Sequence, residues 1–320
     1  MSPGSEHALR NAGKSAEKYT VSLGQMLSET DQDFRKLVST LLRCGLKIRA
    51  EIPKELGALG GVNVYGERQI GIDVWSNDLL ASTLLESGLV KEVGSEELSE
   101  PKRAADGEFS VVFDPIDGSS NVATNNPVGT IVGVYRGEPL PARGDKLVSA
   151  MYMLYGEYTQ LVLALDKGVF SFVDSGRGGV LERFKSTGRK IEISDPGEVY
   201  GVGGHRYAWP EKLRKFVDSL ESRKLKLRYC GCFVGDFNQI LFKGGFFAYP
   251  ELSDSPQGKY RLQFESNPMA YITEKAGGKA SDGARRILTI EPTSISQRTP
   301  TYVGSHSLVS EYEALAVANS

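Results

Sequence analysis

Residues Asp114 to Ser120 (DPIDGSS) bring two carboxylates together with a proline, a glycine and two hydroxyl groups. They follow the apolar run from Phe109 to Phe113, which predicts a buried strand. That strand should end at Asp114, because the next residue is a proline and cannot donate to a ladder. We therefore expect Asp114 and Asp117 on one tight turn, pointing at a common centre, with the Ile116 carbonyl between them. Carboxylate and carbonyl oxygens are hard ligands, which suit Mg²⁺ or Mn²⁺ rather than zinc.

The end of the same segment offers donors for an anion. Gly118 permits a positive φ, and Gly118, Ser119 and Ser120 present closely spaced N–H and hydroxyl groups, which form an anion nest. A nest beside a hard-metal site is what hydrolysis of a phosphate ester requires. A DPxDG segment on its own is as readily a solvated turn. Its position after an apolar strand favours the metal site, because two carboxylates forced together repel each other without a cation.

Three further acidic segments lie beside expected turns or element ends. They are Glu67 with Asp73, the pair Glu96 and Glu97, and Glu265. Adjacent glutamates are common on protein surfaces, so the pair at 96–97 taken alone indicates a solvated face. These carboxylates can act together only if the fold brings them to the DPIDGSS segment.

The elements that must position these residues are those of a mixed α/β chain. Periodicity predicts helices over 28–52, begun by Thr30 and Asp33, over 74–87, and over 268–276 with a proline in the first turn. Apolar runs predict strands over 129–135, 226–230, 240–249 and 259–264, and a hairpin of 161–165 with 169–173. The polar stretch 174–192 predicts a boundary. We expect a flexible arm at 1–25, one sub-domain at 26–192 and a second at 193–320.

Composition excludes several classes of protein. The chain has 320 residues, with 38 basic and 40 acidic side chains and a net charge of −2, so it lacks the basic surface of a nucleic-acid binder. No stretch approaches the about 18 apolar residues of a membrane span. The three cysteines, Cys44, Cys230 and Cys232, are too few for a disulfide scaffold, and the last two are expected to be space-filling core thiols. The first residues lack the apolar core of a secretory signal, which makes the cytoplasm the default location, with an organelle left open.

The DPIDGSS segment resembles the signature of the magnesium-dependent sugar and inositol phosphatases. Longer segments narrow the resemblance: NVYGE at 63–67, DVWSND at 73–78, SEE at 95–97, GGFFAYP at 244–250 and ESNPMAY at 265–271. In this order they are similar to class I fructose-1,6-bisphosphatase and to sedoheptulose-1,7-bisphosphatase, over nearly the whole chain from residue 30. The resemblance implies a five-layer α-β-α-β-α fold and a homodimer or homotetramer.

It also implies roles for individual residues. Two or three Mg²⁺ ions per subunit, replaceable by Mn²⁺, would be held by Glu67, Glu96, Asp114, the Ile116 carbonyl, Asp117 and Glu265. Asp73 and Glu97 would position and deprotonate the attacking water. The 1-phosphate would lie on Gly118, Ser119 and Ser120, and the distal phosphate and sugar on Tyr207, Tyr229, Tyr249 and Lys259. Arg228 would reach the distal phosphate of a neighbouring subunit, and Arg261 would lie near the metals.

The sequence departs from regulated members of this family. The stretch 26–30 does not match their AMP motif, and Glu108 and Phe109 stand where a lysine and a tyrosine of that site are expected. An acidic residue repels a nucleotide phosphate, so we expect no AMP inhibition. The glycine-rich stretch 57–62 holds no cysteine, so thioredoxin control is not expected. Gly204 replaces an asparagine near the distal phosphate, where His205 or Arg206 could take over.

The sequence favours hydrolysis of the C1 phosphate of sedoheptulose 1,7-bisphosphate, as in the Calvin cycle or pentose phosphate metabolism. The short connection 137–146 and the DFNQI segment at 236–240 resemble that branch. The segment at 265–270 resembles the fructose branch, so fructose 1,6-bisphosphate and gluconeogenesis, or dual activity, is the alternative. A monophosphatase acting on inositol or nucleotide phosphates and a non-catalytic sugar-phosphate-binding regulator are further alternatives.

Overall fold

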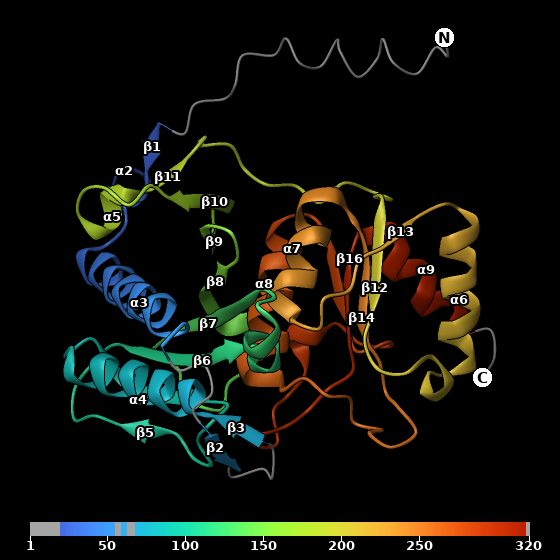
Figure 1. Cartoon of the computed structure of the whole chain (residues 1–320), viewed down its shortest axis with the longest axis horizontal. Helices are drawn as coiled ribbons and strands as arrows, with labels where there is room; N and C mark the ends of the chain where they lie inside the picture. The colour runs from blue at the N-terminus through green and yellow to red at the C-terminus, as the bar shows by residue number, and fades with distance from the viewer. Residues whose placement is uncertain (1–19, 55–58, 63–67, 318–320) are drawn as a thin grey trace.

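The computed structural model describes residues 20–54, 59–62 and 68–317. Glu67 and most of the expected arm at 1–25 lie outside these ranges. Figure 1 shows the course of the chain, with two β-sheets standing between layers of helices. No helix in the described ranges is long and apolar enough to cross a lipid bilayer.

The first half of the chain builds a large sheet. In the described residues its strand order is β1 (Val21–Ser22), β11 (Phe184–Ser186), β10 (Gly168–Asp174), β9 (Thr159–Leu165), β8 (Leu147–Tyr155), β7 (Val128–Arg136), β6 (Phe109–Asp117), β4 (Val90–Ser95) and β5 (Lys102–Arg103). The β4–β6 pair is parallel and the other neighbours are antiparallel. Every residue of β6 is buried, because helices cover both faces of the sheet. A separate two-stranded ribbon joins β2 (Leu59–Val62) to β3 (Arg68–Ile70).

The second half builds a smaller mixed sheet. Its order is β13 (Lys226–Leu227), β12 (Val199–Val202), β14 (Gly245–Tyr249), β16 (Thr301–Gly304) and β15 (Lys279–Ser281). Strand β16 lies between β14 and β15 and is antiparallel to both. The sheet is thus completed by the last strand of the described chain.

Helices complete a five-layer α-β-α-β-α arrangement, which confirms the expected fold. The helices α3 (Gln32–Glu51) and α4 (Gly71–Glu86) cover the outer face of the large sheet. Between the sheets lie α7 (Phe233–Lys243) and α8 (Asn267–Lys275), and α6 (Glu211–Ser222) and α9 (His306–Val317) cover the outer face of the small sheet. Two short helices, α2 (Leu23–Met26) and α5 (Val180–Arg183), lie beside β11 at the edge of the large sheet.

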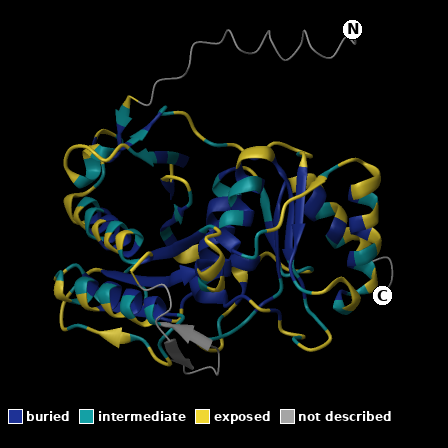
Figure 2. Cartoon of the chain, viewed as in Figure 1, coloured by how far each residue is buried: buried dark blue, intermediate teal, exposed yellow. Residues whose placement is uncertain are grey.

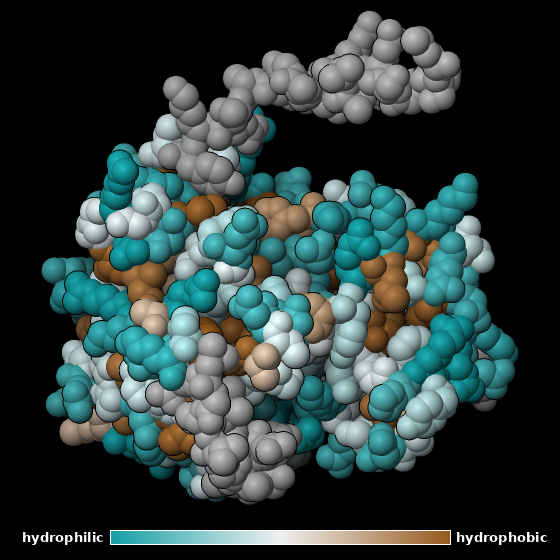
Figure 3. Space-filling view, viewed as in Figure 1, coloured by the Kyte–Doolittle hydropathy of each residue, from teal (hydrophilic) through white to brown (hydrophobic). Residues whose placement is uncertain are grey.

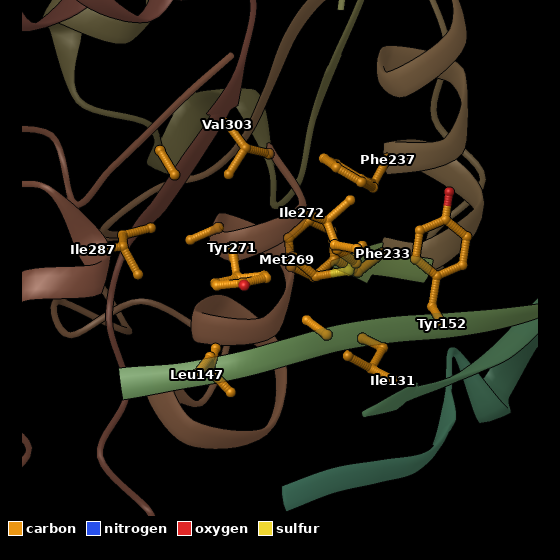
Figure 4. Close-up of a cluster of buried hydrophobic side chains, with 14 of the residues drawn as sticks. Ile131, Leu147, Tyr152, Phe233, Phe237, Met269, Tyr271, Ile272, Ile287 and Val303 are labelled. Carbon is orange, nitrogen blue, oxygen red and sulfur yellow. The ribbon is translucent and has the colours of Figure 1, made fainter. Parts of the chain in front are cut away.

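The middle layer joins the two halves through one apolar core. Figure 4 shows Ile131 and Tyr152 of the large sheet facing Phe233 and Met269 of the middle helices, with Val303 of β16 on the other side. Figure 2 shows the same division over the chain, with the central strands of both sheets dark blue and exposed residues on the outward sides of the helices and on the edge strand β5. The visible face of the molecule is largely hydrophilic, with hydrophobic side chains in scattered patches (Figure 3).

Several expected elements differ from the observed ones. The first long helix begins at Gln32, and Asp31 caps it by accepting the Phe34 N–H at 2.8 Å, in place of the expected start near Thr30. Residues 240–243 continue α7 instead of forming a strand, and β13 is shorter than expected. Residues 262–266 form a π-helical turn in place of a strand. The division between sub-domains at 192 and 193 stays a prediction.

Candidate active site

A cavity of about 300 Å³ lies where the ends of β4 and β6 meet the second half of the chain. Most of the predicted site residues line it. These are Asp73, Glu96, Glu97, Asp114, Ile116, Asp117, Gly118, Ser119, Ser120, Lys259, Arg261 and Glu265. Gly231 and Tyr260 line it too and were not predicted, although Tyr260 stands between two predicted residues in the sequence.

The parallel pairing of β4 with β6 explains how the first carboxylates meet. Ser95 of β4 is paired with Phe113 of β6, and the Glu96 N–H donates to the Phe113 carbonyl at 3.2 Å. Because parallel strands end at the same edge of a sheet, Glu96 and Glu97 emerge beside Asp114. Asp73 joins them from the first turn of α4, where it is buried.

The strand β6 does not stop at Asp114, as the proline suggested, but continues to Asp117. Asp114 is paired with Ile131 and Asp117 with Gly129, so β6 carries one residue more than β7 over this interval. Such a bulge changes the direction of side chains that would otherwise point to opposite faces. The hydroxyl of Thr130 donates to the Pro115 carbonyl at 2.8 Å and holds the bulge. Both aspartates therefore line the cavity.

Gly118 follows the bulge in a left-handed conformation with φ of 76°. A Cβ atom here would lie 2.6 Å from Cβ of Cys232, so both the backbone and the available space require glycine. The 3₁₀-helix Ser119–Thr124 comes next, and its first residues face the cavity. The predicted anion nest is thus in a position to meet a phosphate beside the carboxylates.

Three carboxylates form a compact cluster. Glu96, Asp114 and Glu265 each offer one oxygen, and these oxygens lie within 4.8 Å of one another. Glu265 enters from the π-helical turn Leu262–Ser266, an irregularity frequently found at functional sites. The Arg261 guanidinium, at the start of this turn, forms an ion pair with Glu96, and the Arg261 backbone N–H donates to Glu265 Oε2 at 2.7 Å.

The carboxylates of the cluster repel one another, so added positive charge would stabilise their ionised forms. Burial first, and then the charges of Glu96, Asp117 and Glu265, raise the pKa of Asp114 well above its usual range. Burial and the charge of Glu96 likewise raise the pKa of Glu265, although Arg261 opposes the shift. Buried oxygen ligands that repel one another fit a hard divalent cation, which would relieve the repulsion.

Asp117 is bound differently from the three clustered carboxylates. Its Oδ2 accepts the Val234 N–H at 2.6 Å and the Cys232 thiol at 3.0 Å, both at the start of α7. Burial raises the pKa of Asp117, and these donors together with the charge of Lys259 oppose the shift. Asp117 therefore connects β6 with the other half of the chain.

The residues expected at the distal phosphate are spread out. Lys259 Nζ lies 5.4 Å from the ring centre of Tyr249, and that ring meets Tyr260 edge-on at 5.1 Å. Tyr229 is 46% exposed and Tyr207 is 80% exposed, and neither lines the cavity.

The two residues considered as replacements at Gly204 also have other partners. His205 is stacked on Tyr207, and Arg206 pairs with Asp218. Gly204 has φ of 76°, and a Cβ atom there would lie 2.9 Å from a methyl carbon of Leu252. The turn itself therefore favours glycine at this position.

Comparisons with known proteins identify the family of the chain. The fructose-1,6-bisphosphatase N-terminal domain family matches residues 13–182, and the C-terminal domain family matches residues 193–317. The chain is 45% identical to a class 1 fructose-1,6-bisphosphatase of Geobacter sulfurreducens over 254 residues, 78% of this chain and 80% of that protein. It is 39% identical to one of Syntrophotalea carbinolica over 319 residues, 97% of each chain.

A solved structure has the same fold. The holo form of Leishmania major fructose-1,6-bisphosphatase gives a TM-score of 0.85 at 33% identity, covering 92% of this chain and 98% of that one. Its T-state gives 0.80 at 32% identity with the same coverage. The chain therefore belongs to the class 1 fructose-1,6-bisphosphatase family and is a sugar bisphosphatase, a phosphoric monoester hydrolase.

Proposed function

We propose that this enzyme hydrolyses the C1 phosphate of fructose 1,6-bisphosphate, giving fructose 6-phosphate and phosphate, and that Mg²⁺ is its metal. The cluster of Glu96, Asp114 and Glu265 beside the Gly118 nest carries the proposal, because it offers a cation and a phosphate adjacent places. The relatives named above favour the six-carbon sugar over the seven-carbon sugar that the sequence favoured.

The structure also explains why the DFNQI segment is a weak guide to sugar length. Asp236 accepts the backbone N–H groups of Cys230 and Gly231 at 2.6 and 3.1 Å. Asn238 accepts the Tyr152 hydroxyl at 2.7 Å. Both residues make hydrogen bonds within the fold, and neither of them lines the cavity.

In this proposal the clustered carboxylates and the Ile116 carbonyl hold two or three Mg²⁺ ions. Asp117 and, from outside the described residues, Glu67 complete the set. When bound, Mg²⁺ supplies positive charge that offsets the phosphate and makes a water more acidic. Gly118, Ser119 and Ser120 hold the 1-phosphate through N–H and hydroxyl groups.

The chain's own groups then move the proton. A water oxygen attacks phosphorus in line as the bond from phosphorus to the C1 oxygen breaks, and the leaving C1 oxygen takes a proton from solvent. Asp73 and Glu97 take the water proton as a coupled pair, so no single residue is assigned as the base. Lys259, Tyr207, Tyr229 and Tyr249 hold the distal end of the substrate and supply orientation.

A homo-oligomer is part of the same proposal. Arg228 is exposed, and its guanidinium donates to the neighbouring Leu227 carbonyl instead of reaching the cavity of its own chain. An arginine placed in this way fits a role at the distal phosphate of a second subunit, in a homodimer or homotetramer.

The test is phosphate release with Mg²⁺ from fructose 1,6-bisphosphate and sedoheptulose 1,7-bisphosphate side by side, with inositol 1-phosphate as a third substrate. We expect the highest kcat/KM for the six-carbon bisphosphate. A clear preference for the seven-carbon sugar would overturn the substrate assignment, and binding without release would support a silent binder. Asp114→Asn is the control. It should abolish turnover while leaving the fold intact, because the amide oxygen can still accept the Ile116 N–H.

A further inference from the structure

Cys232 lies at the first point of contact between α7 and the β6 bulge. It is fully buried, and its Sγ lies 3.0 Å from Oδ2 of Asp117. The Val234 N–H reaches the same oxygen at 2.6 Å. The sequence predicted a space-filling thiol at this position, whereas the structure gives the thiol a charged partner in the active-site cavity.

The geometry leaves little freedom for this contact. A Cβ atom on Gly118 would lie 3.1 Å from the Cys232 Sγ, so the thiol occupies the space that this glycine leaves open. The next residue, Phe233, is stacked on Tyr260 with ring centres 4.3 Å apart, and it lies within the core shown in Figure 4. The first turn of α7 is thereby anchored, and its donors have a fixed position relative to Asp117.

The partners of the Cys232 sulfur suit a hydrogen-bond donor. Its Sγ faces two acceptors of Asp117, the carboxylate Oδ2 at 3.0 Å and the backbone carbonyl oxygen at 3.5 Å. The Cys230 sulfur has a different partner, the Cys232 carbonyl oxygen at 3.8 Å, and the two cysteines form no disulfide. A thiol is a weak donor, but a charged acceptor strengthens its hydrogen bond.

We propose that Cys232 is a positioning residue for the hydrolytic site, and this rests on the function proposed above. Its thiol and the Val234 N–H together engage Oδ2 of Asp117. The carboxylate can then meet a cation through Oδ1 without releasing the start of α7. Position 232 accordingly requires a side chain that is both small and a hydrogen-bond donor.

The variants Cys232→Ala and Cys232→Ser separate the donor from the volume. Cys44→Ala is the matched control, because Cys44 is also a buried thiol but lies in α3 and lines no part of the cavity. We expect Cys232→Ala to weaken Mn²⁺ binding about tenfold, as loss of a hydrogen bond to a charged group does. Mn²⁺ alone is the probe, followed by electron paramagnetic resonance titration. Cys232→Ser should recover most of the affinity, and Cys44→Ala should match the wild type.

The S–H stretching band in the infrared spectrum tests the contact without metal or substrate. The wild type minus Cys232→Ser difference spectrum should show a Cys232 band at lower frequency than the Cys44 band, and Asp117→Asn should move it upward. A Cys232 band that Asp117→Asn leaves in place, or wild-type Mn²⁺ binding by Cys232→Ala, would overturn the proposal. These readouts need no turnover, so failure of the substrate assignment would leave them interpretable.

Discussion

The guanidinium of Arg261 is paired with the carboxylate of Glu96 inside the protein, although 165 positions of sequence separate the two residues. The Arg261 side chain is 2% exposed and that of Glu96 is 17% exposed. This ion pair connects the two halves of the chain at the carboxylate cluster. It also places a positive charge directly beside an oxygen of the cluster.

Replacing Arg261 by Met should destabilise the protein strongly in the absence of divalent metal. Removing one partner of a buried ion pair costs about 3–5 kcal/mol, because the other charge stays buried. Added Mg²⁺ should recover part of this loss by supplying the missing positive charge. Thermal melts in EDTA and in Mg²⁺ measure the difference. Lys215→Met, at an exposed pair with Glu211, is the control with a small effect. An equal loss in both solutions would contradict the electrostatic explanation.

Lys259→Ala should act mainly on KM. Lys259 lines the cavity beside Tyr249, away from the clustered carboxylates in the proposed division of roles. Loss of a charged hydrogen bond to the distal phosphate should raise KM about 10- to 100-fold with kcat little changed. Steady-state kinetics with fructose 1,6-bisphosphate measure both constants, and Lys243→Ala, an exposed lysine outside the cavity, serves as control. A fall in kcat at constant KM would assign Lys259 to the chemical step instead.

Asp236 should make stability depend on pH. Burial raises its pKa to about 6 from 3.8, although the Cys230 and Gly231 amides oppose the shift. The folded protein therefore binds this proton more tightly than the unfolded chain does. Its stabilising contribution is full below pH 3.8 and is lost as the pH rises through about 6. A shift of this size corresponds to on the order of 3 kcal/mol.

Urea unfolding of the wild type and of Asp236→Asn at several pH values isolates this contribution. The stability of the wild type relative to the variant should fall between pH 4 and pH 7. Asp106→Asn, at an exposed position, controls for the loss of a carboxylate. A constant difference between wild type and Asp236→Asn would show that the carboxylate keeps its charge throughout.

AMP should not inhibit this enzyme. Arg136 lines a cavity of about 390 Å³ with Glu29 and Asp31, and its guanidinium is already paired with Asp31 and with Glu108. A nucleotide phosphate would have to displace those carboxylates. Phosphate release should therefore be unchanged by millimolar AMP. The double variant Asp31→Asn with Glu108→Gln releases the guanidinium and should gain affinity for AMP. Strong inhibition of the wild type would show that the ion pairs open readily.

Three carboxylates of the site could be predicted from local signals in the sequence, whereas Glu96 and Glu97 taken alone indicated a solvated face. Asp114 and Asp117 follow an apolar strand, and Glu265 precedes a proline-initiated helix. Their common cavity depends on the parallel pairing of β4 with β6, which local periodicity does not contain. The family resemblance supplied that information. The hydrogen bonds from Cys232 and Val234 to Asp117 were not predicted, because these two residues lie more than a hundred positions away in the sequence.

The prediction of secondary structure failed where local sequence patterns were ambiguous. The run 240–249 is apolar throughout, and periodicity cannot show that a helix ends at Lys243 and a strand begins at Gly245. Residues 259–264 alternate as in a strand, but the bonds of Arg261 to Glu96 and to Glu265 accompany a π-helical turn there. Long-range contacts of this kind override local preference.

The position of β16 has a consequence for biosynthesis. This strand, Thr301–Gly304, is inserted between β14 and β15, which are both made earlier. A nascent chain that has been translated only as far as β15 cannot complete the small sheet, because β14 and β15 each pair with β16 and not with each other. Glu265 lies in the π-helical turn that leads into α8, and the apolar core of this middle layer includes Val303 of β16. Phosphatase activity should therefore be gained only after translation has passed Gly304, in one late step shared by the sheet and the site.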